Sequence, residues 1–260
     1  MKIVVCVKQI PDTTDIKWTE NHTINREGVE SVLNPLDFYA LETALQLKDK
    51  LRDVEISVVT MGPLQAEFIL KRAIAMGCDR GLLLSDRKFA GADTFATAKT
   101  LAKVITEKIP DFDMVLCGQF AADGDTAQTG PSLAKQLGVS LLTYVKAVDF
   151  QDSKFSATRE TETNIEKYEV LTPVVLCITQ GDYEPRRPLI DGFIRAKNTN
   201  IERLSCSDIK MCDDEVGLKG SPTYVSRAFT PNIEHAGEIC INEDTEDTVR
   251  KLVSKIKEYV

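Results

Sequence analysis

The chain has 260 residues, of which 43% are hydrophobic and 28% are charged, and its formal net charge is −8. These values describe a globular protein that can bury a sizeable core, and the acidic balance argues against nonspecific binding to nucleic acid or to an anionic membrane surface. No apolar run approaches the ~18–20 residues that span a bilayer, and the N-terminal residues predict a strand rather than a signal peptide. We therefore expect a cytoplasmic protein.

Apolar strand-like runs alternate with helix-like patterns in the first half of the chain. Such alternation predicts a mostly parallel sheet with helices on both faces. Asn34 and Pro35 predict a helix start, with a capping side chain followed by a first-turn proline. The polar stretch 15–26 predicts a small hairpin inside the long 9–33 loop. In chain order we predict strand 2–7, helix 35–50, strand 54–61, helix 64–76, strand 81–84, helix 94–108, strand 113–118 and helix 126–137.

The second half of the chain follows a different pattern. Alternating residues predict antiparallel strands at 141–150, 155–161 and 165–170, and an apolar run predicts a strand at 174–179. From Gln180 onward the chain is rich in Pro, Gly and charge, which predicts irregular structure before a final amphipathic helix at 245–259. Because such a segment cannot form a core by itself, we expect an arm that packs on another protein. Wrapping around its own chain is the alternative.

Seven cysteines and two histidines, His22 and His235, restrict metal and redox chemistry. No two cysteines form a Cys-x-x-Cys pair, and Cys6, Cys117 and Cys177 lie in or beside predicted strands, where cysteine behaves as a small hydrophobe. The spacing of Cys206 and Cys212 is a weak metal signature without a nearby histidine. We therefore expect structural thiols, with no metal site and no histidine-based catalysis.

The most informative stretch is 117–131, Cys-Gly-Gln-Phe-Ala-Ala-Asp-Gly-Asp-Thr-Ala-Gln-Thr-Gly-Pro, between a predicted strand and a predicted helix. Its glycines let the backbone approach a ligand, and the helix start offers free N–H groups to a phosphate. It has neither the P-loop lysine nor a Gly-x-Gly-x-x-Gly motif. Asp123 and Asp125 fit magnesium binding, acid–base chemistry, ribose binding or turn closure. Two acids without a lysine favour ligand binding over phosphoryl transfer.

Ligands of a doubly wound sheet bind beyond the carboxyl ends of its strands. Besides the loop just described, the segments 6–13, 60–63 and 85–97 satisfy this rule. Thr94 and Thr97 stand where a helix begins, so that they either donate to a phosphate or cap the helix.

The chain resembles the β-subunits of electron-transfer flavoproteins over nearly its whole length. The resemblance rests on ordered segments: Val4-Val5-Cys6-Val7-Lys8-Gln9-Ile10-Pro11-Asp12-Thr13, Leu33-Asn34-Pro35-Leu36-Asp37, Ala40-Leu41-Glu42-Thr43-Ala44-Leu45, Val59-Thr60-Met61-Gly62-Pro63, Gly91-Ala92-Asp93-Thr94 and 123–131. These variants look most like subunits from anaerobes that bifurcate electrons. The resemblance implies an α/β, Rossmann-like (adenine nucleotide α-hydrolase-like) fold: a mostly parallel doubly wound sheet with an extended C-terminal arm.

The resemblance also implies a heterodimer with a larger α-subunit. Most family members bury AMP in this subunit, whereas the bifurcating group holds a second FAD that takes hydride from NADH. One electron then passes to ferredoxin or flavodoxin, and the other passes through the α-subunit FAD to an acyl-CoA or similar flavin dehydrogenase. A nonbifurcating subunit with structural AMP, or a stand-alone adenine-nucleotide-binding protein, are the alternatives.

Carried over by position, one group of residues would contact the adenine nucleotide, and a second group would lie near the extra FAD or its phosphates. The first is Cys6, Asn34, Asp37, Met61, Gly118, Gln119, Phe120, Ala121, Ala122, Asp123, Gly124, Asp125, Thr126, Ala127, Gln128 and Thr129; the second is Pro11, Asp12, Thr94 and Thr97. The family usually has glutamine at the position of Phe120. Either Gln119 replaces that glutamine, or Phe120 stacks on a ring.

Residues 183–190 resemble the loop by which these β-subunits dock onto acyl-CoA dehydrogenases. Leu189 or Ile190 falls at the family's aliphatic anchor, and Arg186 belongs to its charged rim, an arrangement typical of an interface hot spot. Packing of both aliphatic side chains under the loop is the alternative. We thus expect a nucleotide-binding domain at 1–185, and at 186–260 a recognition loop and an arm that packs on the α-subunit.

Overall fold

The computed structural model describes residues 1–12, 31–226 and 244–258. The chain divides into two compact units, Met1–Ser226 and Arg227–Val260. The predicted hairpin at 15–26 and both histidines lie outside the described residues. Among the residues described, no helix has the length and apolar character needed to cross a membrane.

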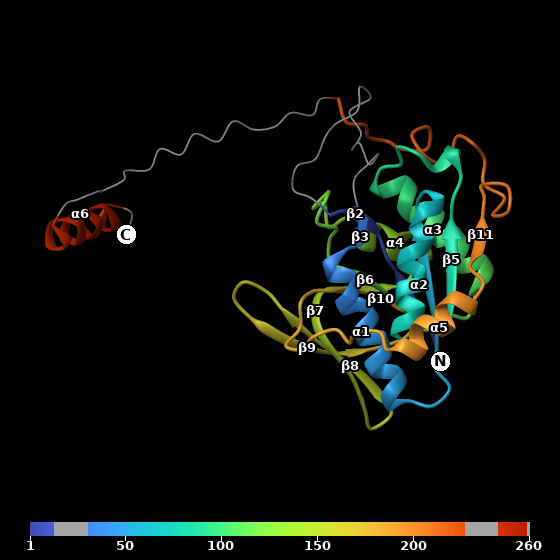
Figure 1. Cartoon of the computed structure of the whole chain (residues 1–260), viewed down its shortest axis with the longest axis horizontal. Helices are drawn as coiled ribbons and strands as arrows, with labels where there is room; N and C mark the ends of the chain where they lie inside the picture. Colours follow the sequence, from blue (N-terminus) through green and yellow to red (C-terminus); the bar gives the residue numbers. More distant parts are fainter. Residues whose placement is uncertain (13–30, 227–243, 259–260) are drawn as a thin grey trace. The chain divides into compact units, whose positions relative to one another are not determined.

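A nine-stranded sheet forms the centre of the first unit, in the order β11-β5-β4-β1-β6-β10-β7-β8-β9 (Figure 1). Every pairing from β11 to β7 is parallel, and β8 and β9 add antiparallel pairings at one edge. This confirms the mostly parallel, Rossmann-like sheet. The strands are β1 Lys2–Cys6, β4 Glu55–Met61, β5 Arg80–Leu84, β6 Met114–Gly118, β7 Ser140–Gln151, β8 Lys154–Glu160, β9 Ile165–Val170, β10 Val174–Ile178 and β11 Glu202–Leu204.

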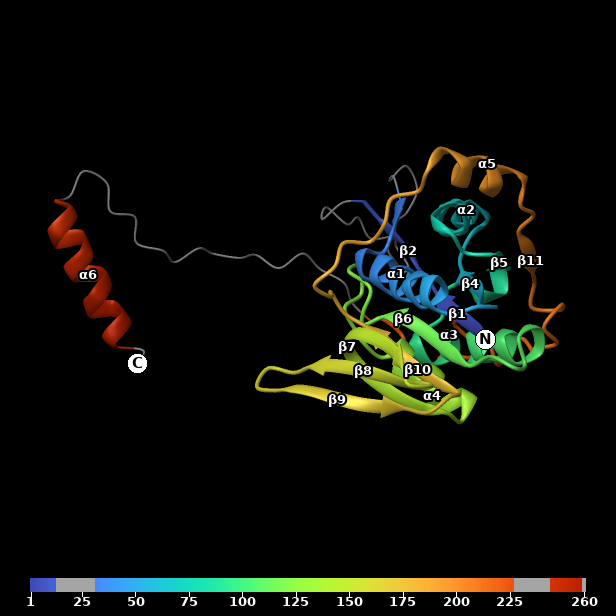
Figure 2. The same ribbon diagram turned by 90° about the horizontal axis from the view of Figure 1, so that it is seen from below.

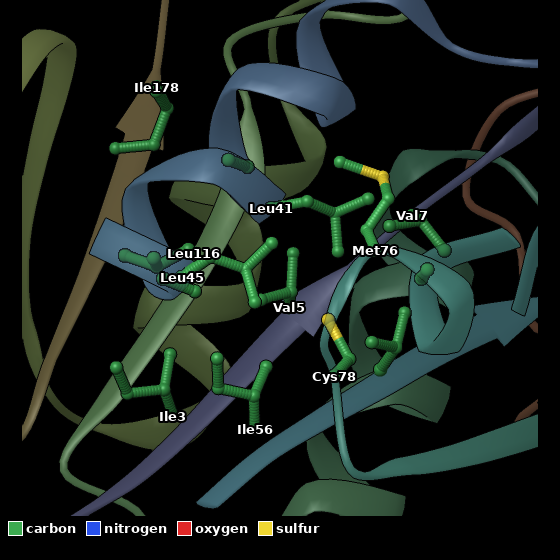
Figure 3. Close-up of a cluster of buried hydrophobic side chains, with 14 of the residues drawn as sticks. Ile3, Val5, Val7, Leu41, Leu45, Ile56, Met76, Cys78, Leu116 and Ile178 are labelled. Atoms are coloured by element: carbon green, nitrogen blue, oxygen red, sulfur yellow. The ribbon is translucent and has the colours of Figure 1, made fainter. Parts of the chain in front are cut away.

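Helices cover both faces of the parallel strands (Figure 2). On β1, Ile3 and Val5 belong to the core cluster under α1 and α2, whereas Val4 and Cys6 belong to the cluster on the α3 and α4 side. Figure 3 shows Val5 near Leu41 of α1, and Ile3 beside Ile56 of β4, in the first cluster. The helices are α1 Pro35–Lys50, η1 Leu64–Ala66 followed by α2 Glu67–Met76, η2 Arg87–Phe89, α3 Thr94–Lys108 and α4 Thr129–Leu137.

The strand order places a topological switch between β1 and β6. After β1 the chain adds β4 and then β5 on one side, and it then returns to place β6 on the other side of β1. Helices that leave β1 and β6 therefore diverge, which opens a crevice beyond the carboxyl ends of these two strands. The loop at 117–131 follows β6, so it lies at this switch point.

Tyr144 divides β7 into two parts. Its φ is 57°, in the left-handed region that a bulky side chain seldom adopts. Residues on its N-terminal side pair with β10, and Val145 to Gln151 pair with β8. The predicted antiparallel strands are thus confirmed, with β9 at its predicted bounds.

The prediction of irregular structure after Gln180 is wrong for part of that segment. Residues 190–198 form α5 (Ile190–Asn198), and β11 pairs with β5. Helix α5 lies outside α2 (Figure 2), where Gly192 has no room for a Cβ against the carbonyl of Ala75. Arg195 donates to the Ile74 carbonyl, and Lys71 donates to the Ala196 carbonyl.

The first unit extends to Ser226, and the division at 185 into a nucleotide-binding domain and a docking arm stays a prediction. The second unit holds α6 (Thr245–Lys257), which ends two residues before the predicted helix. Its apolar stripe, Val249, Leu252, Val253 and Ile256, is exposed. Packing of this segment on an α-subunit stays a prediction.

Candidate functional site

Asp37, in the first turn of α1, joins the ends of β1 and β6. Its Oδ2 accepts from the N–H of Lys8 at 2.7 Å, and its Oδ1 accepts from the N–H of Gly118 at 3.2 Å. Only 4% of Asp37 is exposed. Burial raises the pKa of this carboxyl to about 7, although the N–H donors and the Lys8 ammonium act to lower it. Gly118 is required here, because a Cβ would collide with Oδ1 of Asp37.

Asn34 holds the loop that follows β6. Its Nδ2 donates to the Phe120 carbonyl and to Oδ1 of Asp37, both at 3.0 Å, and its Oδ1 accepts from the Ala122 N–H at 3.1 Å. The prediction that its side chain caps α1 is therefore wrong: Asn34 occupies the cap position but makes no side-chain cap bond. Pro35 does begin the helix, as predicted.

Lys8 and Asp123 form an ion pair at the same edge, with Nζ and Oδ1 2.6 Å apart. The Asp123 side chain is 2% exposed and the Lys8 side chain 44% exposed. The sequence prediction placed Asp123 in the site but omitted Lys8, because the loop itself contains no lysine. The signal was the position of Lys8 directly beyond the first strand.

Gln119 and Phe120 have different environments. The Gln119 side chain is buried, and its Oε1 accepts from the Tyr144 N–H at 2.7 Å. The backbone N–H of Gln119 donates to the Ile178 carbonyl. Gln119 therefore connects the loop to both β7 and β10. The Phe120 ring is 36% exposed. Replacement of the family's glutamine by Gln119 and stacking by Phe120 both stay predictions.

The tip of the loop is a turn, and α4 begins later than predicted. The N–H groups of Gly124 and Asp125 both donate to the Ala121 carbonyl. Asp125 and Ala127 have φ of 47° and 52°, values that no right-handed helix can contain. Helix α4 therefore starts at Thr129 rather than 126. The described part of the loop presents the exposed residues Ala122, Gly124, Asp125, Thr126 and Gln128.

Three cysteines form a row beneath the loop. Cys6, Cys117 and Cys177 are register neighbours on β1, β6 and β10, and the sulfurs of the latter two are 3.7 Å apart. Burial raises the pKa of Cys6 to about 12, so its thiol stays neutral. Gly130 of α4 packs directly on this row. A Cβ at this position would collide with the Cys177 sulfur and would lie 3.0 Å from the Cys117 sulfur. The strand positions of these cysteines are as predicted. Within the described residues no Cys, His, Asp and Glu side chains are grouped for a metal ion.

The N-terminus of α3 is capped by Asp93, not by Thr94 or Thr97. Asp93 Oδ1 accepts from the Ala96 N–H at 2.9 Å, and its Oδ2 accepts from the Thr223 hydroxyl. Thr94 instead donates to Oε1 of Gln128 at 3.1 Å, which brings the start of α3 against the loop. No cap bond is made by Thr97, which is half-buried.

The other predicted residues lie at the same edge of the sheet. Met61 ends β4 and is half-buried, while Pro11 is buried at the end of the short strand β2 (Gln9–Pro11), which pairs with β3 (Ser31–Leu33). Asp12 is exposed. In the part of the chain that the structure describes, two buried oxygens at this edge have no hydrogen-bond partner: Oε1 of Gln9 and Oγ1 of Thr60. Both residues lie in the candidate segments 6–13 and 60–63, although neither was singled out as a site residue.

The predicted docking residues lie on α5 and the loop before it. Leu189 and Ile190 are 77% and 78% exposed, so they do not pack under the loop. Phe193 and Ile194 extend this apolar surface along α5. Arg186, in contrast, makes bonds of 2.7–3.0 Å to Glu42 and Asp49 of α1. It anchors the loop rather than standing free.

Comparison with known proteins gives a consistent result. The model of the electron transfer flavoprotein domain matches residues 21–208. The chain is 44% identical to an electron transfer flavoprotein subunit beta of Thermoanaerobacterium thermosaccharolyticum, over 98% of each chain. It is 41% identical to CarD, a subunit of the caffeyl-CoA reductase–Etf complex of Acetobacterium woodii, over 99% of this chain and 98% of CarD.

A further relative is the FixA protein of Bradyrhizobium diazoefficiens, with 38% identity over 98% of this chain and 91% of FixA. The matched region contains the β6 loop, α1 and α3, which build the carboxyl edge described above. The chain therefore belongs to the electron transfer flavoprotein family, as one of its β-subunits.

Proposed function

We propose that this β-subunit binds FAD beyond the carboxyl ends of β1 and β6, and that this FAD accepts hydride from NADH. One electron passes to ferredoxin or flavodoxin, and the other passes through an FAD of the α-subunit to an acyl-CoA or similar flavin dehydrogenase. The observation that carries the proposal is the switch-point loop, which buried Asn34 and Asp37 hold beside the starts of three helices, α1, α3 and α4.

The residues at this edge fit an adenine nucleotide. A buried oxygen without a partner costs about 1–3 kcal/mol, and Gln9 and Thr60 each have one here. A ligand with N–H or O–H groups would satisfy such atoms. The Lys8 ammonium and the N-terminus of α4, which has no side-chain cap, provide positive charge and free N–H groups for phosphates. This agreement supports nucleotide binding at the edge.

When bound, FAD would supply the hydride and electron transfer, since that chemistry belongs to the flavin. The side chains of this chain bind and orient it. Lys8, locked by Asp123, holds a positive charge at the end of β1. The exposed Phe120 offers an aromatic face at the mouth of the site.

Docking on the partner dehydrogenase is assigned to α5. Its exposed Leu189, Ile190 and Phe193 form an apolar patch beside a groove of about 700 Å³ between α5 and the end of α2. Arg187 lines this groove, is exposed, and has no ion-pair partner among the described residues. An aliphatic anchor with a free arginine suits a partner that presents a pocket rimmed by acids. The name of CarD, from a complex with a CoA-substrate reductase, supports this class of partner.

A nonbifurcating subunit with structural AMP is the second candidate, because the same edge would hold the shorter nucleotide. The test is to co-purify the chain with its α-subunit and to count FAD and AMP per heterodimer. The proposal predicts two FAD and no AMP, with reduction of both flavins by NADH. One FAD with one AMP would overturn it in favour of the second candidate. A chain that never pairs with an α-subunit would overturn the heterodimer as well.

A further inference from the structure

Two predicted ligand-binding side chains are fully engaged with the protein itself. Asp37 accepts from Lys8 N–H, Gly118 N–H and Asn34 Nδ2, and Asn34 in turn holds Phe120 and Ala122 through their backbone groups. Asn34 is 1% exposed and Asp37 4% exposed. Neither side chain is therefore placed to read a nucleotide. Both determine where the backbone of the loop stands.

This arrangement favours the ionised form of Asp37. A carboxylate only accepts hydrogen bonds, and here its two oxygens face three N–H donors. A protonated carboxyl would weaken these bonds by removing the negative charge, and it would add an O–H for which none of the three partners is an acceptor. Protonation of Asp37 thus loosens the hold on the backbone that the ligand must approach.

We propose that Asn34 and Asp37 are positioning residues for the nucleotide loop, and that nucleotide binding fixes Asp37 in its ionised form and so releases a proton. The inference rests on the proposed nucleotide site but not on the choice between FAD and AMP. A nucleotide is itself an anion, and its charge alone would favour proton uptake. Proton release on binding would therefore indicate that the held loop fixes Asp37 in its ionised form. Proton uptake would indicate repulsion between the Asp37 carboxylate and the anionic nucleotide.

The charged groups around Asp37 leave it as the titrating group. Lys8 lies at the end of β1 and is paired with Asp123. Cys6 on β1 and Cys117 on β6 face Asp37, and their pKa values are raised so that both remain neutral thiols. Burial raises the pKa of Asp37 to about 7. The carboxyl therefore titrates between pH 6 and 8, where binding can be measured by calorimetry.

The test is calorimetric titration of the nucleotide-free full chain with FAD, and with AMP if FAD does not bind. Buffers of different ionisation enthalpy give the number of protons released per ligand at pH 6, 7 and 8. Because His22 and His235 are the only histidines, a background with both changed to glutamine removes the other side chains that ordinarily titrate in this range. Subtracting the number of protons released by Asp37→Asn from the number released by the wild type removes any contribution from protons of the ligand itself.

Wild-type protein should release nearly one proton at pH 6 and almost none at pH 8, and Asp37→Asn should abolish this difference. Asn34→Ala should lower affinity about tenfold or more while proton release persists. Asp111→Asn is the matched control: Asp111 pairs with Lys2 at the opposite end of β1 from the loop, so release should be unchanged.

Proton uptake, or equal release in Asp37→Asn, would overturn the inference. If Asp37→Asn does not fold, the pH dependence of the wild-type affinity for nucleotide is the test. Below pH ~7 this affinity should decrease with falling pH, approaching a tenfold loss per pH unit. Affinity that is constant from pH 5.5 to 8 would contradict the inference. Absence of any nucleotide binding would defeat the proposed function itself.

Discussion

The proposed nucleotide edge, at the carboxyl ends of β1 and β6, and the α5 surface are built in opposite ways. At the edge of β1 and β6, buried polar side chains such as Asn34 and Asp37 bond to backbone, and the loop is held from inside. On α5, apolar side chains are exposed, and the helix is fixed from beneath by Gly192, Arg195 and Lys71. A cofactor site needs a fixed backbone, whereas a docking site needs free side chains on a fixed helix. Substitutions should separate the two regions.

Gly118→Ala should have the largest effect, and it should be confined to the nucleotide edge. The added Cβ would collide with Asp37 and stand 3.0 Å from the Leu36 Cβ, and such overpacking costs about 1–3 kcal/mol. We expect loss of nucleotide affinity by two orders of magnitude or more, a lower free energy of unfolding, and unchanged docking. Urea unfolding and equilibrium binding of FAD measure both effects. Full nucleotide affinity in this variant would contradict the role given to Asp37.

Gly192→Ala is the matching change at α5. Its Cβ would meet the Ala75 carbonyl, so α5 would be pushed from α2 at a similar cost of about 1–3 kcal/mol. Nucleotide affinity should be retained, and electron transfer to the dehydrogenase should fall. Stopped-flow reduction of the dehydrogenase, compared with FAD binding, reports the two quantities. Loss of both together would mean that the regions are not independent.

Ile190→Asp should weaken docking without loss of stability. Ile190 is 78% exposed, and surface substitutions usually change stability by less than about 0.5 kcal/mol. Loss of an apolar anchor typically costs about 2 kcal/mol in binding, so affinity for the dehydrogenase should fall roughly thirtyfold. Asn198→Asp, at an exposed position of the same helix, adds the same single negative charge and is the control. An unchanged affinity for Ile190→Asp would remove α5 from the docking surface.

Asp93→Ala should have the smallest effect, a loss of about 1 kcal/mol for the lost helix cap. Burial acts to raise the pKa of Asp93, but donors from Ala96 and Thr223 hold it below the ordinary value. The stabilisation is therefore present above the unfolded pKa of about 3.9 and is lost as pH falls through the lower folded value. Thermal unfolding should show a stability deficit of Asp93→Ala relative to the wild type at pH 7, and this deficit should shrink below pH ~4. A deficit that is constant with pH would show that the charge of Asp93 is not involved.

Much of the fold was predictable because local signals agree with the tertiary structure. Helix α1 runs over its predicted residues because Pro35 fits the first turn, and α3 does so because Asp93 caps it. Helix α5 escaped prediction because its apolar residues face outward and no buried stripe marks it. Strand β11 has only three residues and owes its existence to pairing with β5.

The meeting of the candidate segments at one edge of the sheet was predictable, but the contacts between them were not. Loop 117–131 and the segments around Asn34 and Met61 do meet at one edge, as the rule for carboxyl ends requires. That Asn34 reaches across to Phe120 and Ala122, or that Lys8 pairs with Asp123, depends on side-chain geometry between segments far apart in the chain. Residue type and spacing contain no record of such pairs.

The most direct test of the account is to count the flavins released from purified heterodimers that contain either the wild-type β-subunit or Gly118→Ala. The account predicts two FAD per wild-type heterodimer and one per variant heterodimer, because only the β-subunit site is blocked. Two FAD in both proteins would place the second flavin elsewhere, and AMP in the wild type would contradict the claim that this edge holds FAD.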